Sequence, residues 1–335
     1  MSISPRAGAP LDVDYIEKLL KGNVKDFFAA TQSQDDSKLK YGPLSQLPGD
    51  WTGKGFSILS LPNNYPKNPK AKFQLMMNAT IEDTQFTRIG APIPDRGNTQ
   101  DDIFYLGMTY LQKVSDAQTL EGIHIEPGLL LNLPGNPVQT VPSVVRLATI
   151  PHGDAVMAQG PFILSLPVPI PDVDSTPFTL DLNGNRVNDP SDTYLEPFKN
   201  ATPPPGIPYD AVKNPNLILQ QYNDDLLNAG KSIIPYSVFQ VNVNPVGGIA
   251  DVPPLPAVSG DVGGITNIPF VNTNANANSM SATFWTNIVM NPDASMYVVL
   301  QYSQTVILDF PVPNGNDIIT PIKWPHISVA NLLQR

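Results

Sequence analysis

The chain has 335 residues, of which 41% are apolar, 15% are charged and 37 are prolines, and its formal net charge is −10. This acidic balance argues against nucleic acid as a partner and against electrostatic binding to anionic membranes, since both need a basic face. The absence of cysteine excludes disulfides and thiolate sites. No apolar run reaches the length of a membrane-spanning helix and no signal-peptide pattern opens the chain, so we expect no membrane span and a cytoplasmic location.

Residues 1–40 are predicted to form an N-terminal helical arm. Tyr15, Leu19 and Leu20 recur at helical spacing, and the same face continues to Phe27. Gly22 interrupts this face, which favours two short helices over one. The arm precedes a single domain that we expect to span residues 41–335.

The rest of the chain is dominated by strand-like alternation of apolar and polar residues. Trp51 precedes the first such segment and is expected to plug one end of a barrel, the alternative being an ordinary core tryptophan. Pro127 and Gly128 are expected to break the ladder of their strand. Further strand-like segments lie at residues 73–89, 102–116, 120–134, 144–159, 233–243, 279–291, 296–310 and 322–333. Eight to ten strands with little helix predict an all-β, antiparallel barrel closed by its terminal strands.

A proline-rich insertion is predicted at about residues 165–260. Prolines recur through LPVPIPDVDSTPF and PPPGIP, where a regular ladder is disfavoured. One helix is expected inside the insertion, because Leu217, Ile218, Tyr222 and Leu226 recur at helical spacing and Gly230 offers a stop.

The candidate ligand-binding residues lie between residues 120 and 160. His124 and Glu126 alternate with Ile123 and Ile125, so the two polar side chains share one strand face. Arg146 lies in the next strand, where its planar fork suits a ligand carboxylate. We consider two roles for His124 and Glu126: a polar or acid–base pair facing a ligand, or a buried hydrogen-bond network with Arg146.

Four segments carry a resemblance to known groups of proteins. LPGDWTGKGF followed by a long-stranded meander resembles the calycins, that is, lipocalins, fatty-acid-binding proteins and nitrobindin-like haem proteins. EGIHIEPGLLLNLP, VVRLATIPHG and WPHISVANL are similar to bacterial and fungal proteins described as haem-binding or peroxidase-like. The resemblance covers about residues 44–160 and 265–333. It implies a ligand-binding barrel in which a histidine near the C-terminus holds haem iron.

His326 is the residue that this resemblance makes a haem-iron ligand, and it follows Pro325 in the last strand. The alternative is a histidine bonded to backbone at the end of the barrel. His152 is expected in a turn at the barrel mouth, where it can line a ligand entrance. A metal site built from His124, His152 and His326 is chemically possible, but the three lie on separate elements and their spacing does not indicate one.

Three hypotheses for function follow. The first is binding of a small hydrophobic ligand with an acidic end, with haem as the leading cofactor candidate and peroxidase-like activity if iron keeps an open position. The second is a metal-free lipid or terpenoid binder, or a cyclase or isomerase, using the same cavity. The third is a structural β-protein whose proline-rich middle mediates self-association. No GxSxG elbow and no GxxxxGK[ST] loop occurs, which argues against a hydrolase of that type and against nucleotide binding.

Overall fold

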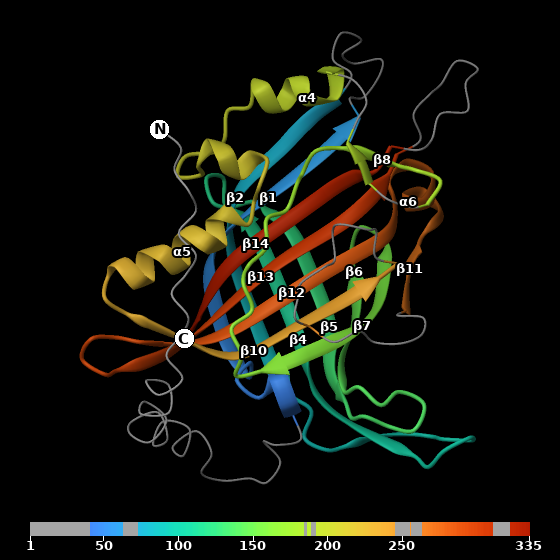
Figure 1. The fold of residues 1–335 in the computed structure, drawn as a ribbon. Coiled ribbons are helices and arrows are strands. Elements are labelled where there is room, and N and C mark those ends of the chain that lie inside the picture. The colour runs from blue at the N-terminus through green and yellow to red at the C-terminus, as the bar shows by residue number, and fades with distance from the viewer. Residues whose placement is uncertain are drawn as a thin grey trace.

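The computed structural model describes residues 41–62, 73–183, 186–188, 192–244, 255, 263–310 and 322–335. Within these residues, ten antiparallel strands form a closed barrel (Figure 1). The barrel strands are β1 (Gly49–Pro62), β2 (Phe73–Arg88), β4 (Ile103–Asp116), β5 (Gly122–Leu133), β6 (Ser143–Ile150), β7 (Asp154–Leu164), β10 (Ser232–Val243), β12 (Asn276–Met290), β13 (Met296–Asp309) and β14 (Trp324–Gln334). The predicted all-β class is confirmed, and the barrel is compatible with a calycin-like fold. The predicted arm at residues 1–40 lies outside the described residues.

The barrel closes through two long-range strand pairings. The first and last strands, β1 and β14, pair from Trp51 opposite Gln334 to Leu59 opposite His326, as predicted. The second closure joins β7 to β10, between Gln159–Leu164 and Ser237–Asn242. Because every barrel strand then has two neighbours, the sheet leaves few open edges for pairing with other chains.

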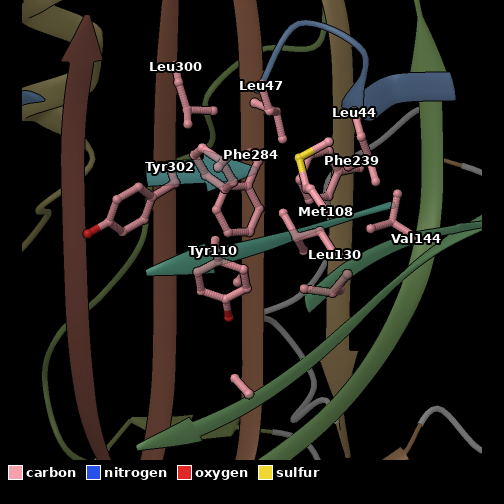
Figure 2. Packing of buried hydrophobic residues seen from close by; sticks show 14 of the residues in the cluster. Leu44, Leu47, Met108, Tyr110, Leu130, Val144, Phe239, Phe284, Leu300 and Tyr302 are labelled. Atoms are coloured by element: carbon pink, nitrogen blue, oxygen red, sulfur yellow. The ribbon is translucent and has the colours of Figure 1, made fainter. Parts of the chain in front are cut away.

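One end of the barrel is filled by apolar side chains. Trp51 is 1% exposed there and donates a hydrogen bond from Nε1 to the Leu47 carbonyl at 2.7 Å. The 3-10 helix η1 (Gly42–Leu44) lies across this end and contributes Leu44 to the cluster. Figure 2 shows the cluster, with Tyr110 and Tyr302 at its edge and their hydroxyl groups directed away from the apolar side chains. Trp51 therefore belongs to the plug, as predicted.

The strand β5 runs unbroken through Pro127 and Gly128, so the predicted break in the ladder is wrong. Both residues pair with β4, Pro127 opposite Leu111 and Gly128 opposite Tyr110. A Cβ atom at Gly128 would lie 2.5 Å from the Tyr110 ring, so glycine makes room for that ring. Pairing with β6 starts only at Gly128, so Pro127 lies beyond the part of the strand paired on both sides.

The proline-rich segment after β7 covers the outside of the barrel. The predicted helix is present as α5 (Leu217–Asn228), and a shorter helix α4 (Asp192–Lys199) precedes the 3-10 turn η2 (Tyr209–Val212). Both helices lie outside the barrel wall (Figure 1). A second apolar cluster joins this layer to the wall and includes Leu219, Trp285 and Trp324. The strand β10, which falls in the range predicted as the insertion, is part of the barrel.

Short elements complete the described chain. The strand β3 (Ile93–Asp95) pairs with β4, and β8 (Phe178–Leu180) pairs with β9 (Arg186–Asn188). The strand β11 (Gly263–Asn267) pairs with Asp154–Ala158 of β7 and leads into α6 (Pro269–Asn274). One edge of β7 pairs with β6, and its other edge pairs with β10 along one half and with β11 along the other half.

Candidate functional site

The end of the barrel opposite the plug holds a cavity with two lobes. One lobe has a volume of about 500 Å³ and the other about 460 Å³. The two lobes share the lining residues Leu59, His124, His152, Gln304 and His326, so these side chains stand where the lobes meet. Each lobe by itself is within the size range of small-molecule sites, roughly 300–1,000 Å³.

The two lobes differ in chemistry. The polar lobe has a mixed lining. Apolar side chains such as Phe56, Met76 and Val114 lie there beside hydroxyl, amide and carboxylate groups, which include Ser57, Asn78, Thr80, Gln112, Asp116 and Glu121. The apolar lobe is lined mainly by hydrocarbon, including Ile150, Val156, Ile265, Met280, Val306 and Leu308. The arrangement suits an amphipathic molecule whose apolar body and polar end occupy different lobes.

Glu126 and Arg146 form a buried ion pair beside the apolar lobe. Glu126 is 0% and Arg146 4% exposed, and Arg146 Nη2 donates to Glu126 Oε1 at 2.6 Å. Arg146 Nε also donates to the same oxygen at 3.1 Å, and the Tyr110 hydroxyl donates to it as well. Three donors therefore converge on one carboxylate oxygen, which is the condition under which a buried charge is tolerated.

The ion pair fixes the protonation of its members. Burial alone would raise the pKa of Glu126, but the Arg146 charge and hydrogen bonds from His124, Tyr110 and Arg146 lower it to about 2. Burial also disfavours the charged guanidinium, and the Glu126 carboxylate outweighs it and raises the pKa of Arg146. Both groups are charged at neutral pH, and their charges cancel. The structure thus has the buried network that the sequence offered as one of two roles.

The remaining contacts of the pair reach the lobe junction. His124 Nε2 lies 3.4 Å from Glu126 Oε2, and Arg146 Nη1 donates to Gln304 Oε1 at 2.6 Å. The strands β5 and β13 supply these two side chains from different sides of the barrel. The ring of His152 lies edge-on to that of His124, with 5.8 Å between centroids.

His152 lies in the β6–β7 turn and is exposed, while it lines both lobes. The turn requires glycine at its third residue, because Gly153 has a φ of +111° and a Cβ there would lie 2.4 Å from Ile268. Burial, followed by the charge of His124, lowers the pKa of His152. A neutral imidazole at the mouth of the cavity is the result.

His326 faces the cavity from β14. Its Nε2 lies 3.1 Å from the Ser57 hydroxyl, which also lies 3.2 Å from the hydroxyl of Ser328. Burial, then the charges of His124 and His152, lower the pKa of His326 to about 4. His326 is therefore neutral at physiological pH, and its hydrogen-bond partner is a serine side chain. The alternative to an iron ligand that the sequence analysis offered was a hydrogen bond to the backbone.

A second buried carboxyl group, Glu82, was missed by sequence reasoning. It is 1% exposed and accepts hydrogen bonds from Tyr302 at 2.7 Å, Gln112 at 2.9 Å and Thr84 at 2.8 Å. Burial raises the pKa of Glu82 more than these bonds lower it. A small void of about 30 Å³ separates this group from Arg146, and is large enough for a water molecule.

The structure brings together all five residues that the sequence singled out. Barrel closure places His124, His152 and His326 around one space although they come from different elements, so their sequence separation was no argument against proximity. Across the described residues, no group of three histidine, aspartate or glutamate side chains has the geometry of a metal site. In the same part of the chain, no helix has the length and apolarity that crossing a membrane requires.

Comparisons with known proteins add the following. No family model matches the chain, and no curated protein matches it. Among solved structures, the crystal structure of Rv2717c from M. tuberculosis is similar at 14% sequence identity and a TM-score of 0.37, over 87% of this chain and 95% of that chain. A likeness this distant carries no functional argument, so the functional interpretation depends on the cavity itself.

Proposed function

We propose that this protein binds a small hydrophobic ligand inside its barrel. The observation that carries the proposal is the two-lobed cavity. Its hydrocarbon-lined lobe and its polar lobe meet at three histidine side chains and Gln304. Burial of apolar ligand surface supplies about 25 cal/mol per Å², and a few polar groups then fix its orientation.

The residues present fit haem only in part. His326 offers a neutral imidazole to both lobes, as an iron ligand must. The porphyrin carboxylates lack a partner: Arg146 is the only lysine or arginine among the described lining residues, and its charge is already cancelled by Glu126. The geometry therefore favours the metal-free ligand over haem, and it disfavours the acidic ligand end expected from the sequence.

A direct test uses a neutral apolar fluorophore, N-phenyl-1-naphthylamine. We expect saturable enhancement of its fluorescence by the purified protein, abolished in Val306→Trp because the new ring fills the apolar lobe. Val138→Trp, at a position that is 73% exposed, is the matched control and should bind as the unmodified protein does. Circular dichroism checks that both variants fold. Absence of saturable binding to the unmodified protein overturns the proposal.

Haem is tested in parallel. Hemin is added to the protein and to its His326→Ala and His152→Ala variants, and the Soret region is recorded. A sharp Soret shift lost only in His326→Ala would restore haem as the ligand. A shift that is absent, or indifferent to His326, supports the metal-free ligand.

A further inference from the structure

The orientation of the Gln304 amide is fixed by Arg146. A guanidinium group donates hydrogen bonds and accepts none, so the Gln304 atom that meets Arg146 Nη1 at 2.6 Å is the carbonyl oxygen. The Nε2 group then lies on the other side of the amide. No described residue accepts a hydrogen bond from Gln304 Nε2, while the side chain lines both lobes. Gln304 thus presents amide protons to the cavity.

The tautomer of His124 is fixed by Glu126 in the same way. Glu126 is ionised, so its Oε2 only accepts, and the His124 Nε2 at 3.4 Å must carry the proton. In the neutral imidazole, the other ring nitrogen, Nδ1, is then an acceptor. No described residue bonds to it, and His124 lines both lobes. His124 in this form thus presents an acceptor at the junction of the lobes, where Gln304 also presents its donor.

One ion pair therefore positions both groups. The carboxylate end of the Glu126–Arg146 pair holds His124, and the guanidinium end holds Gln304. Because the pair is buried and hydrogen-bonded to both side chains, it orients His124 and Gln304 toward the junction of the lobes.

We propose that His124 and Gln304 recognise the polar end of the ligand, and that this end is a hydroxyl group on an apolar body. This inference rests on the proposed function. A hydroxyl group both donates and accepts, so it satisfies His124 Nδ1 and Gln304 Nε2 together. A carboxylate only accepts, so it cannot serve the His124 acceptor, and it finds no unpaired cation among the described lining residues, which disfavours it. The ligand class is a neutral, long-chain or cyclic alcohol.

The test compares two ligands with the same hydrocarbon body, 1-dodecanol and dodecanoate, by displacement of N-phenyl-1-naphthylamine at pH 8. We expect dodecanol to bind at least about tenfold more tightly than dodecanoate. Gln304→Leu should weaken dodecanol about five- to tenfold, the equivalent of one net hydrogen bond, and leave dodecanoate nearly unchanged. Gln221→Leu, at an exposed position of α5, is the matched control and should change neither affinity.

A second variant separates recognition from folding. Gln304→Glu keeps an oxygen for Arg146 and loses the amide donor, so dodecanol should weaken as in Gln304→Leu while the fluorophore still binds. If the fluorophore binds the unmodified protein but dodecanol is not preferred over dodecanoate, or both Gln304 variants bind dodecanol normally, this inference is overturned and the proposed function stands. If the fluorophore itself does not bind, both are overturned.

Discussion

The two ends of the barrel are built from the same ten strands but are stabilised by different interactions. At the plugged end, large apolar side chains such as Phe239, Phe284 and Leu130 fill the interior (Figure 2). At the cavity end, a buried ion pair and hydrogen bonds hold the walls around space that no side chain fills. At the plugged end, burial of apolar surface stabilises the fold. At the cavity end, burial of charged groups around an open space lowers the free energy of unfolding. The difference explains why charged residues occur on otherwise apolar strand faces.

The largest effect is expected where the network of the cavity end is broken. Arg146→Met leaves Glu126 buried without its counter-charge, and we expect it to lower the free energy of unfolding by about 3–5 kcal/mol. Urea denaturation at pH 7 measures this loss. Arg96→Met is the control, because Arg96 is 78% exposed in its pair with Asp102 and should change stability by no more than about 0.5 kcal/mol. Similar small losses in both variants would show that the network does not hold the cavity end.

Matched truncations sharpen the contrast between the ends. Leu44 is 0% exposed within the plug, so Leu44→Ala creates a new void and should cost about 2–5 kcal/mol. Leu59 lines both lobes, so Leu59→Ala only enlarges existing space and should cost about 1 kcal/mol. Thermal and urea unfolding of the two variants give the comparison. Equal costs would mean that the lobes are packed as tightly as the plug.

His326 gives the cavity end a distinctive pH dependence. Its pKa is lowered to about 4 in the folded protein, below the usual value near 6.5, mainly by burial. Between these values the unfolded chain binds a proton that the folded protein does not, so stability falls as the pH falls from about 6.5 to 4. The contribution is roughly 3 kcal/mol at the acidic limit. His326→Gln should flatten the dependence in urea denaturation at pH 7, 5.5 and 4.5, and an unchanged slope would contradict the assignment.

The smallest effect is expected for Glu82, the buried glutamate that has no ion-pair partner among the described residues, and Glu126 serves as its comparison. Burial raises the pKa of Glu82, so its ionisation opposes folding: stability present below its unfolded pKa near 4.5 is lost as the pH rises. Glu82→Gln should therefore stabilise the protein at pH 8, because the glutamine carries no charge into the buried site. Glu126→Gln should destabilise it, because it leaves Arg146 without a counter-charge. Destabilisation by both variants would show that Glu82 also depends on its charge.

Much of the fold was readable from local pattern. Period-two alternation located the strands, and the spacing of Leu217, Tyr222 and Leu226 located α5. Pro127 misled, because a proline is tolerated where the pairing to β6 has not yet begun. The pairing of β7 with β10 joins segments about 80 residues apart and has no local signal.

The site was predictable to a similar degree. Alternation placed His124 and Glu126 on one face, and Arg146 stood out as a charge in a buried strand. Gln304 is a polar residue between Tyr302 and Val306 on its strand face, but Gln301, Ser303 and Thr305 make the whole segment look polar. Glu82 gives no such signal, because Thr80 and Thr84 flank it on the same face. The three histidines lie close together only because the barrel closes. Closure depends on the register between strands that are far apart in the chain, which the local sequence pattern does not reveal.

The edge of β7 that pairs with both β10 and β11 has a consequence for access from solvent to the apolar lobe. Along Asp154–Ala158 the neighbour of β7 is the five-residue strand β11, and the barrel strand β10 takes over only from Gln159. β11 and α6 contribute Ile265 and Phe270 to the apolar lobe, and Phe270 is 70% exposed. Detaching so short a strand disrupts far fewer contacts than opening any barrel strand, so it belongs to the low end of local opening free energies. On the proposed function, a ligand could then enter the apolar lobe through this local opening without global unfolding, and the amides of residues 263–267 should exchange with deuterium sooner than those of β12 or β13.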